Sequence, residues 1–225
     1  MAPREIRVAG REALTLVTEL LQRVRRTDPQ AGLWEAADLQ WLWRKPRESD
    51  DIDQLFWLDD HGPVAGVFLS SWTGAAWQCD PIVVPHVSGP DPEVVWERAL
   101  DHAAVHAGTG LEVPVRDDDP VFTTLAERSG LVVGERSSVA WMDVSDPVTK
   151  VGLVEPVRVE EAFQRQGLAK AMLTAGLERL ATQGAHRAKI GFRIRRSRRP
   201  VPEHRLPTHL HSHLVPNQVG PRRFV

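Results

Sequence analysis

Residues 151–182 read VGLVEPVRVEEAFQRQGLAKAMLTAGLERLAT, and this stretch is the most specific part of the chain. Its first nine residues predict an apolar strand, which Pro156 interrupts because proline cannot donate a hydrogen bond to the ladder. A short turn follows. A helix is then predicted from Gly167 to Thr182, with Gly184 as its stop.

The start of this predicted helix is suited to binding an anion. A helix that begins at a turn of small residues presents free backbone N–H groups and the positive end of its dipole. Gly167 and Ala169 keep the amides accessible, and Arg165 and Lys170 add positive charge beside them. A pyrophosphate is the ligand that this arrangement favours. The alternative is a plain strand-turn-helix unit in which Gly167 serves packing alone.

The pattern Gln164-x-x-Gly167-x-Ala169, placed between a strand and a helix, resembles the acetyl-CoA motif of the Gcn5-related N-acetyltransferase (GNAT) superfamily. A further predicted strand at 187–191 has its expected place in that family. The resemblance implies acetyl-CoA as co-substrate and no metal. It implies an N-acetyltransferase that moves an acetyl group to an amine of a small molecule or a protein. The alternative is a catalytically weak or inactive remnant that only binds CoA.

The resemblance also assigns roles to individual residues. The end of the strand would pair with the pantetheine arm through its main chain, and the turn and first helical residues would wrap the pyrophosphate. A carboxylate near the strand would take a proton from an ammonium substrate; Glu155 is the candidate, with Glu160 and Glu161 as alternatives. The implied cofactor-binding set is Val157, Arg158, Val159, Gln164, Arg165, Gln166, Gly167, Leu168, Ala169 and Lys170.

The sequence before residue 146 predicts strands and helices in an order that resembles one complete GNAT domain. Helices that interrupt a run of strands indicate an α/β class, with a mixed, mostly antiparallel twisted sheet flanked by helices. The predicted elements are strand 5–8, helices 12–25 and 33–43, hairpin strands 55–58 and 64–72, strand 75–85, helix 92–107 capped by Asp91, strand 111–115, helix 120–128 and a pair of strands within 131–144.

This order implies a tandem GNAT layout similar to that of mycothiol synthase, truncated in the second copy. Residues 1–145 are predicted to be a degenerate GNAT-like domain, because the loop at 84–90 has no glycine-rich phosphate turn. Residues 146–192 are predicted to be a partial GNAT domain that carries the acetyl-CoA motif. Its own first strand and two helices are missing, because residues 145–150 leave no room for them. Residues 193–225 are predicted to be a disordered tail rich in Arg, Pro and His.

The tail departs from the GNAT pattern. The family continues into another helix that often carries a tyrosine, the general acid for the departing thiolate, and this chain contains no tyrosine. Apolar periodicity ends after Phe192, where an Arg-rich segment begins, and this abrupt change suggests a shift of reading frame. The basic tail raises nucleic-acid binding as an alternative. With few interleaved aromatic residues and no recognised module, no nucleic-acid partner is predicted.

The tail also contains His209-x-His211-x-His213, which in a strand would place three imidazoles on one face. Proline residues bracket this segment, so incidental histidines in a disordered tail are predicted and a metal site is not.

Composition sets the remaining limits. A chain of 225 residues with 42% hydrophobic content and a net charge of −2 can bury an ordinary core. No apolar run reaches the roughly 18 residues that span a bilayer, and the N-terminus lacks the apolar region of a signal peptide. The lone Cys79 excludes an internal disulfide and is interpreted as a small strand residue. We therefore expect a cytoplasmic protein with no membrane partner.

Overall fold

The computed structural model describes residues 3–29, 31–43, 46–71, 77–107, 110–143, 151–153, 166–185, 187–193 and 208–216. The chain divides into two compact units: unit 1 is Met1–Arg136 with His211–Val225, and unit 2 is Ser137–Leu210. The division lies inside a strand, β6 (Leu131–Asp143), and so precedes the boundary expected at residue 145.

Unit 1 contains the elements that the sequence predicts, in the predicted order. Residues 131–143 differ, because they form one strand and not a pair. The elements are β1 (Arg4–Val8), α1 (Gly10–Thr27), α2 (Ala36–Leu42), the 3₁₀ turn η1 (Glu48–Asp51), β2 (Gln54–Asp59), β3 (Gly62–Ser71), β4 (Trp77–Val83), α3 (Pro92–His106), β5 (Leu111–Arg116), α4 (Pro120–Arg128) and the start of β6.

The sheet of unit 1 is mixed, which confirms the predicted α/β class. Strands β1 to β4 are antiparallel neighbours in chain order. Strand β5 lies parallel to β4, and the two pair only at Trp77↔Leu111 and Gln78↔Glu112. A parallel pair needs a crossover connection, and α3 supplies it.

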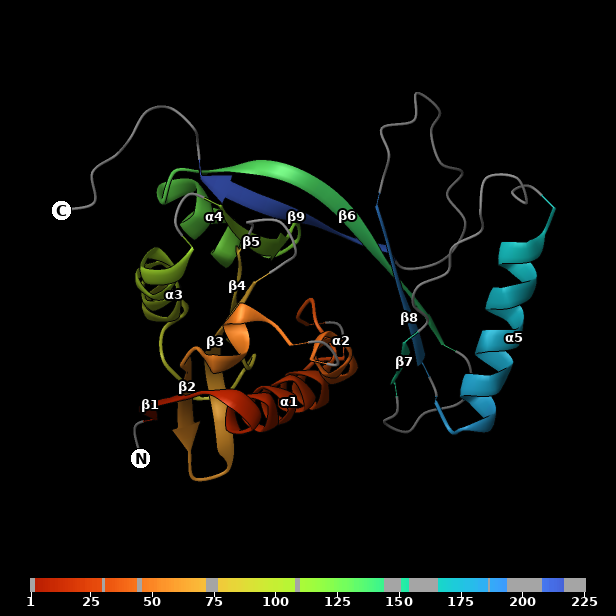
Figure 1. Ribbon diagram of the computed structural model, residues 1–225, viewed down its shortest axis with the longest axis horizontal. Helices are drawn as coiled ribbons and strands as arrows, with labels where there is room; N and C mark the ends of the chain where they lie inside the picture. The colour runs from red at the N-terminus through yellow and green to blue at the C-terminus, as the bar shows by residue number, and fades with distance from the viewer. Residues whose placement is uncertain are drawn as a thin grey trace. The chain divides into compact units, whose positions relative to one another are not determined.

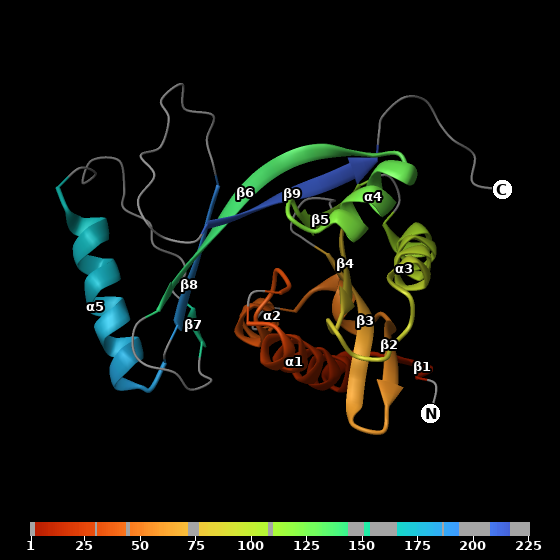
Figure 2. The ribbon, with the colours of Figure 1, turned by 180° about the vertical axis from the view of Figure 1, so that it is seen from behind.

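Alternate residues of the central strands point into two separate cores. Leu55 and Trp57 pack with residues of α3 and α4, whereas Phe56 between them packs with residues of α1 and α2. Because successive side chains of a strand point to opposite faces, this alternation places one pair of helices on each face of the sheet. Figures 1 and 2 show α1 and α2 on one side of the unit 1 sheet, with α3 and α4 on the other.

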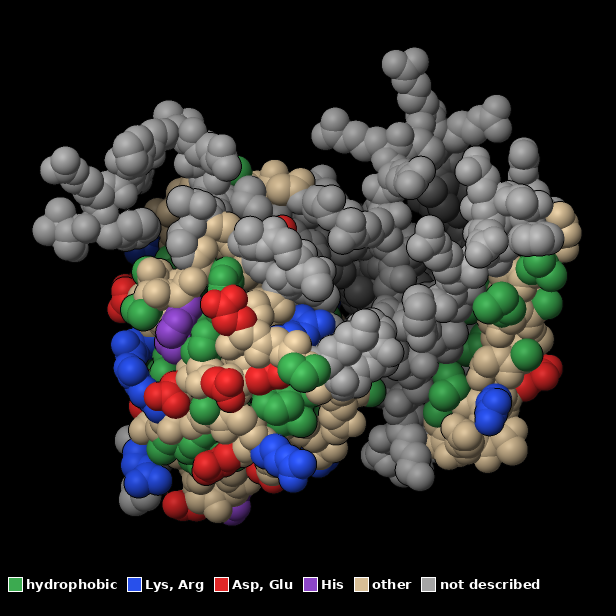
Figure 3. Space-filling model, in the orientation of Figure 1, with side chains coloured by type: hydrophobic (Ala, Val, Ile, Leu, Met, Phe, Trp, Pro, Cys, Tyr) green, Lys and Arg blue, Asp and Glu red, His purple; other side chains and the backbone are tan. Residues whose placement is uncertain are grey.

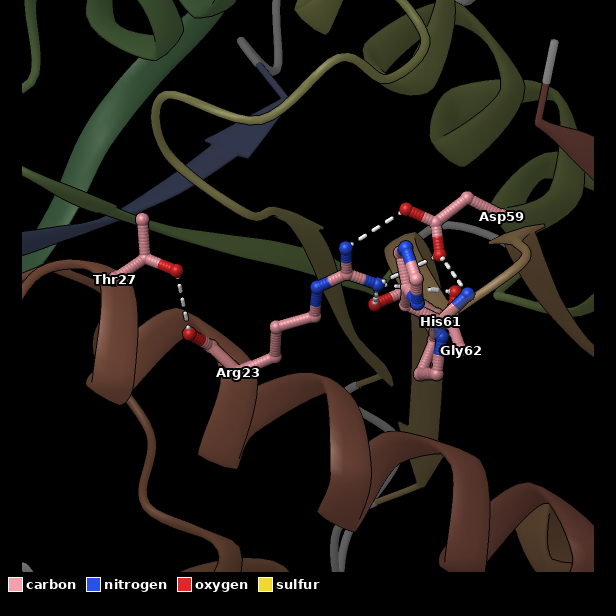
Figure 4. Close-up of polar contacts among 6 residues, drawn as sticks. Arg23, Thr27, Asp59, His61 and Gly62 are labelled. Atoms are coloured by element: carbon pink, nitrogen blue, oxygen red, sulfur yellow. Dashed lines mark hydrogen bonds and ion pairs between the residues drawn. The ribbon is translucent and has the colours of Figure 1, made fainter. Parts of the chain in front are cut away.

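The turn between β2 and β3 is fastened to α1 by Arg23 (Figure 4). Two nitrogens of its guanidinium donate to the two carboxylate oxygens of Asp59, at 2.9 Å and 2.7 Å. The same guanidinium donates to the carbonyl of Gly62 at 3.3 Å, and the backbone N–H of His61 donates to Asp59 at 2.7 Å. The hydrogen bond from Arg23 lowers the pKa of Asp59 to about 2.

The described residues of unit 2 include three paired strands and one helix. Residues 137–143 of β6 pair antiparallel with β8 (Arg187–Arg193), and β7 (Val151–Leu153) pairs parallel with β8. The helix α5 (Leu168–Thr182) connects β7 to β8. None of its residues is buried. Leu168 and Met172 are 42% and 49% exposed, and hydrophobic side chains lie on the surface of this helix in Figure 3.

The segment Thr208–Pro216 differs from the prediction of a disordered tail, since it forms strand β9. It pairs antiparallel with β5 from Val113↔Leu214 to Arg116↔His211. This is the part of β5 that does not pair with β4, so β9 supplies hydrogen-bond partners to an otherwise open strand. His209, His211 and His213 lie within this strand. No group of residues suited to a metal ion is found in the described part of the chain. The described helices also include none that is long and apolar enough to cross a membrane.

Candidate functional site

The start of α5 has the backbone geometry of an open anion site. Gly167 is the N-cap residue, with a φ of 82°, and as a glycine it has no side chain that could cap the helix. The first helical hydrogen bond runs from the N–H of Ala171 to the carbonyl of Gly167, at 3.0 Å. The N–H groups of the preceding three residues have no partner within the helix, so they can bind an anion.

The glycine at this position is required by its backbone angle. A Cβ added to Gly167 would meet no atom within 4 Å, so space does not exclude a side chain in the protein as it stands. The left-handed φ is what L side chains adopt rarely. A glycine at 167 therefore serves two purposes. It leaves the backbone amides accessible to an anion, and it adopts the left-handed φ of this position.

The helix lies in the chain between two parallel strands. β7 pairs with β8 at Val151↔Arg187, Gly152↔Ala188 and Leu153↔Lys189, and α5 is the crossover between them (Figure 1). A helix that follows a parallel strand starts at that strand's carboxyl end, where ligands bind in many α/β proteins.

The structure describes half of the predicted cofactor-binding set. Gln166, Gly167, Leu168, Ala169 and Lys170 are consecutive residues at the start of α5, and all five are exposed. The other predicted contacts, Val157, Arg158, Val159, Gln164 and Arg165, lie outside the described residues. So do the candidate base Glu155 and its alternatives Glu160 and Glu161.

Unit 1 contains a segment of the same plan, in which β4, α3 and β5 form a parallel strand pair with a crossover helix. The predicted cap of α3 is confirmed, because the carboxylate of Asp91 accepts a hydrogen bond from the N–H of Glu93 at 2.9 Å. Pro92 occupies the first helical position and has no N–H. The starts of α3 and α5 therefore differ in the groups they offer to an anion.

Sequence reasoning missed a buried carboxylate in unit 1. Asp80, on β4, accepts hydrogen bonds from Trp34 Nε1 at 2.7 Å and from Gln78 Nε2 at 2.8 Å. Its side chain is buried, and this burial raises the pKa of Asp80 to about 6. An acid in the stretch 77–83, which is apolar apart from Gln78 and Asp80, was the available signal.

Cys79, the neighbour of Asp80, lies on the opposite face of β4. It is a buried free cysteine whose Sγ lies 3.6 Å from the carbonyl oxygen of Ala99. Burial raises the pKa of this thiol, so the reactive thiolate is disfavoured. The interpretation of Cys79 as a small strand residue is confirmed.

Residues 84–195 match the model of the acetyltransferase (GNAT) family. Together with the fold, this match supports the GNAT superfamily for the chain. The matched segment runs from the end of β4 to β8 and includes the start of α5. A family of acetyltransferases implies an enzyme of the acyltransferase kind.

Solved structures are similar to this chain in fold. A GCN5-related N-acetyltransferase from Sphaerobacter thermophilus has a TM-score of 0.57 and 9% sequence identity, with 95% of this chain and 96% of that chain covered. At that identity the likeness concerns the fold alone.

Two further structures are less similar. A tandem GNAT protein from the clavulanic acid biosynthesis pathway has a TM-score of 0.46 at 14% identity, covering 84% of this chain and 69% of its own. The yncA protein from Salmonella typhimurium, solved with its cofactor acetyl-CoA, has a TM-score of 0.44 at 15% identity, covering 60% and 83%. A comparison with curated proteins found no match.

Proposed function

We propose that this protein is an N-acetyltransferase that moves an acetyl group from acetyl-CoA to an amine of a small molecule or a protein. The observation that carries the proposal is the start of α5. Gly167, at a φ of 82°, is the N-cap residue of a helix that follows one of two parallel strands in the chain and precedes the other, inside the segment that matches the GNAT family.

The chain's part in cofactor binding follows from this geometry. The first N–H groups of α5 and the positive end of its dipole bind the pyrophosphate, and Lys170 adds a positive charge in the same turn. Glutamine and arginine at 164 and 165 complete the cradle on the turn side. The main chain of Val157, Arg158 and Val159 pairs with the pantetheine arm as an added strand would.

The reaction needs little covalent chemistry from the protein. Acetyl-CoA supplies the acetyl group as a thioester. A neutral amine attacks the carbonyl carbon, a C–N bond forms as the C–S bond breaks, and CoA leaves as the thiolate. The nitrogen then loses its second proton, which the thiolate takes up through solvent. Glu155 takes the proton from the ammonium substrate, while positioning of the two reactants supplies most of the rate.

A tandem arrangement is part of the proposal. The strand-helix-strand segments β4–α3–β5 and β7–α5–β8 support two GNAT-like halves in one chain, the first of them degenerate. The cofactor motif belongs to the second.

Calorimetric titration with CoA tests the proposed site. Gly167→Asp introduces both a carboxylate and an unfavourable φ at the start of α5, and we expect at least a tenfold loss of affinity. Gly184→Asp is the matched control, since Gly184 has a φ of 80° and an added Cβ there also meets nothing within 4 Å. It lies beyond the opposite end of the helix, where no contact with CoA is proposed, so affinity should fall far less than in Gly167→Asp. Equal affinity in the wild type and Gly167→Asp would remove the assignment.

A further inference from the structure

The two strand-helix-strand segments of the chain contain helices of equal length. Helices α3 and α5 each contain 15 residues. Each lies between parallel strands that pair near their beginnings, at Trp77↔Leu111 in unit 1 and Val151↔Arg187 in unit 2. The start of α3 is therefore the internal counterpart of the proposed pyrophosphate site at the start of α5.

The first turn of α3 is occupied by the protein's own carboxylates. Asp91 caps the helix and accepts the N–H of Glu93 at 2.9 Å. Pro92 removes another donor because it has no N–H. Glu93 adds a second carboxylate to the same turn, and its partner Arg128 lies 2.9 Å away, on the neighbouring helix α4. The negative groups complement the helix dipole and repel a second anion from this end.

The first turn of α5 has the opposite character. It contains no acidic residue, and its N-cap residue is a glycine, which has no side chain to cap the helix. Lys170 gives this turn a positive charge, and every residue has its backbone N–H.

We infer that Asp91 and Glu93 close the start of α3 to phosphate groups, so that each chain binds one CoA, in unit 2, and unit 1 binds none. This inference rests on the proposed function, because it assumes that CoA binds at α5. It also gives a physical reason for the degeneracy of unit 1, because the carboxylate of Asp91 accepts a backbone N–H at the helix start that a pyrophosphate would need.

Nuclear magnetic resonance on the full chain labelled with ¹⁵N tests the inference site by site, with CoA as the probe. We expect saturating shifts at the backbone N–H groups of Leu168, Ala169 and Lys170, none at those of Glu93 and Val94, and a stoichiometry of one CoA per chain. Saturating shifts at Glu93 and Val94, or a second equivalent of bound CoA, would overturn the inference and leave a CoA site in place. An absence of binding at both helices would instead remove the proposed function.

A charge reversal tests the reason for the closure. Lys170→Glu gives the first turn of α5 an acid, as in α3, and we expect a loss of CoA affinity of at least tenfold. Arg179→Glu is the matched control, because Arg179 is an exposed residue in the last turn of the same helix. Both side chains are exposed, so neither change should unfold the unit. If Lys170→Glu bound CoA with the affinity of the wild type, a carboxylate in the first turn would not prevent phosphate binding at a helix start. That result would overturn the inference.

Discussion

Asp80 should make unit 1 less stable as the pH rises. Its carboxylate is buried on β4 and holds the indole of Trp34 and the amide of Gln78. Burial raises its pKa from 3.8 to about 6, since two hydrogen bonds only partly replace the lost water. Between these values the folded protein keeps a proton that the unfolded chain releases. The free energy of unfolding therefore falls as the pH rises through this window. The contribution of Asp80 is complete only below the pKa of the unfolded chain.

The size of the effect follows from the shift. Each pKa unit corresponds to about 1.4 kcal/mol. With an unfolded value of 3.8 and a folded value of about 6, linkage predicts a loss of about 2 kcal/mol in the free energy of unfolding between about pH 4.5 and about pH 7.5. Asp80→Asn preserves the shape of the side chain and cannot titrate, so it should lack this component.

The assay is urea unfolding followed by circular dichroism at several pH values. The difference in unfolding free energy between wild type and Asp80→Asn should change by about 2 kcal/mol over that range, in favour of the wild type at low pH. Asp59→Asn is a control for which the stability should change with pH in the opposite direction. The pKa of Asp59 is lowered to about 2, so its contribution, about 1 kcal/mol for a solvent-screened pair, is lost as the pH falls from about 4 toward 2. Parallel pH profiles for wild type and Asp80→Asn would refute the reasoning.

Three further predictions concern other parts of the chain. The pKa of His102 is lowered by burial and by the nearby charges of His106, Arg7 and Arg98, so the wild type should lose stability below pH 6.5; His102→Gln should lose less when both are unfolded in urea. Turnover should be slow, because the chain has no tyrosine to protonate the thiolate and general acids contribute roughly 10² to 10⁴ in rate. Rapid, saturable thiol release with any amine of a panel would contradict this. Backbone amides of α5 should exchange with solvent faster than those of α3 and slow down when CoA is added, as measured by hydrogen exchange.

The sequence was enough to predict the element order of unit 1 because its signals are local. Asp91 and Pro92 mark the start of α3 in the sequence as they do in the structure. The core residues of α1 recur at the helical spacing, with Val17, Leu20, Leu21 and Val24 all buried. Such signals depend on neighbours along the chain, so a single sequence contains them.

Features that depend on distant partners could not be predicted in this way. The strand Thr208–Pro216 exists beside β5, which lies far away in the sequence, and its own composition indicates disorder. Residues 131–143 were predicted as a pair of strands, whereas they form a single strand whose second half pairs with the distant strand β8. The role of Asp80 depends on Trp34, which a different part of the chain brings to it.

The helix start at Gly167 was predictable for the same reason that the start of α3 was, since its signal is a glycine at a helix start. Cofactor binding there stays a prediction. What the sequence could not indicate is how weakly the rest of α5 is held. In α3 five residues are buried, among them Trp96 and His102, and in α5 none is. Helices of this length are marginal in water without packing. Contacts at the start of α5 therefore contribute a larger fraction of the stability of that helix than the Asp91 cap contributes to the stability of α3. An anion bound by the N–H groups of the first turn stabilises only the helical state that presents them. Binding at the proposed site would therefore be thermodynamically linked to formation of α5, and part of the binding free energy would be spent on ordering the helix.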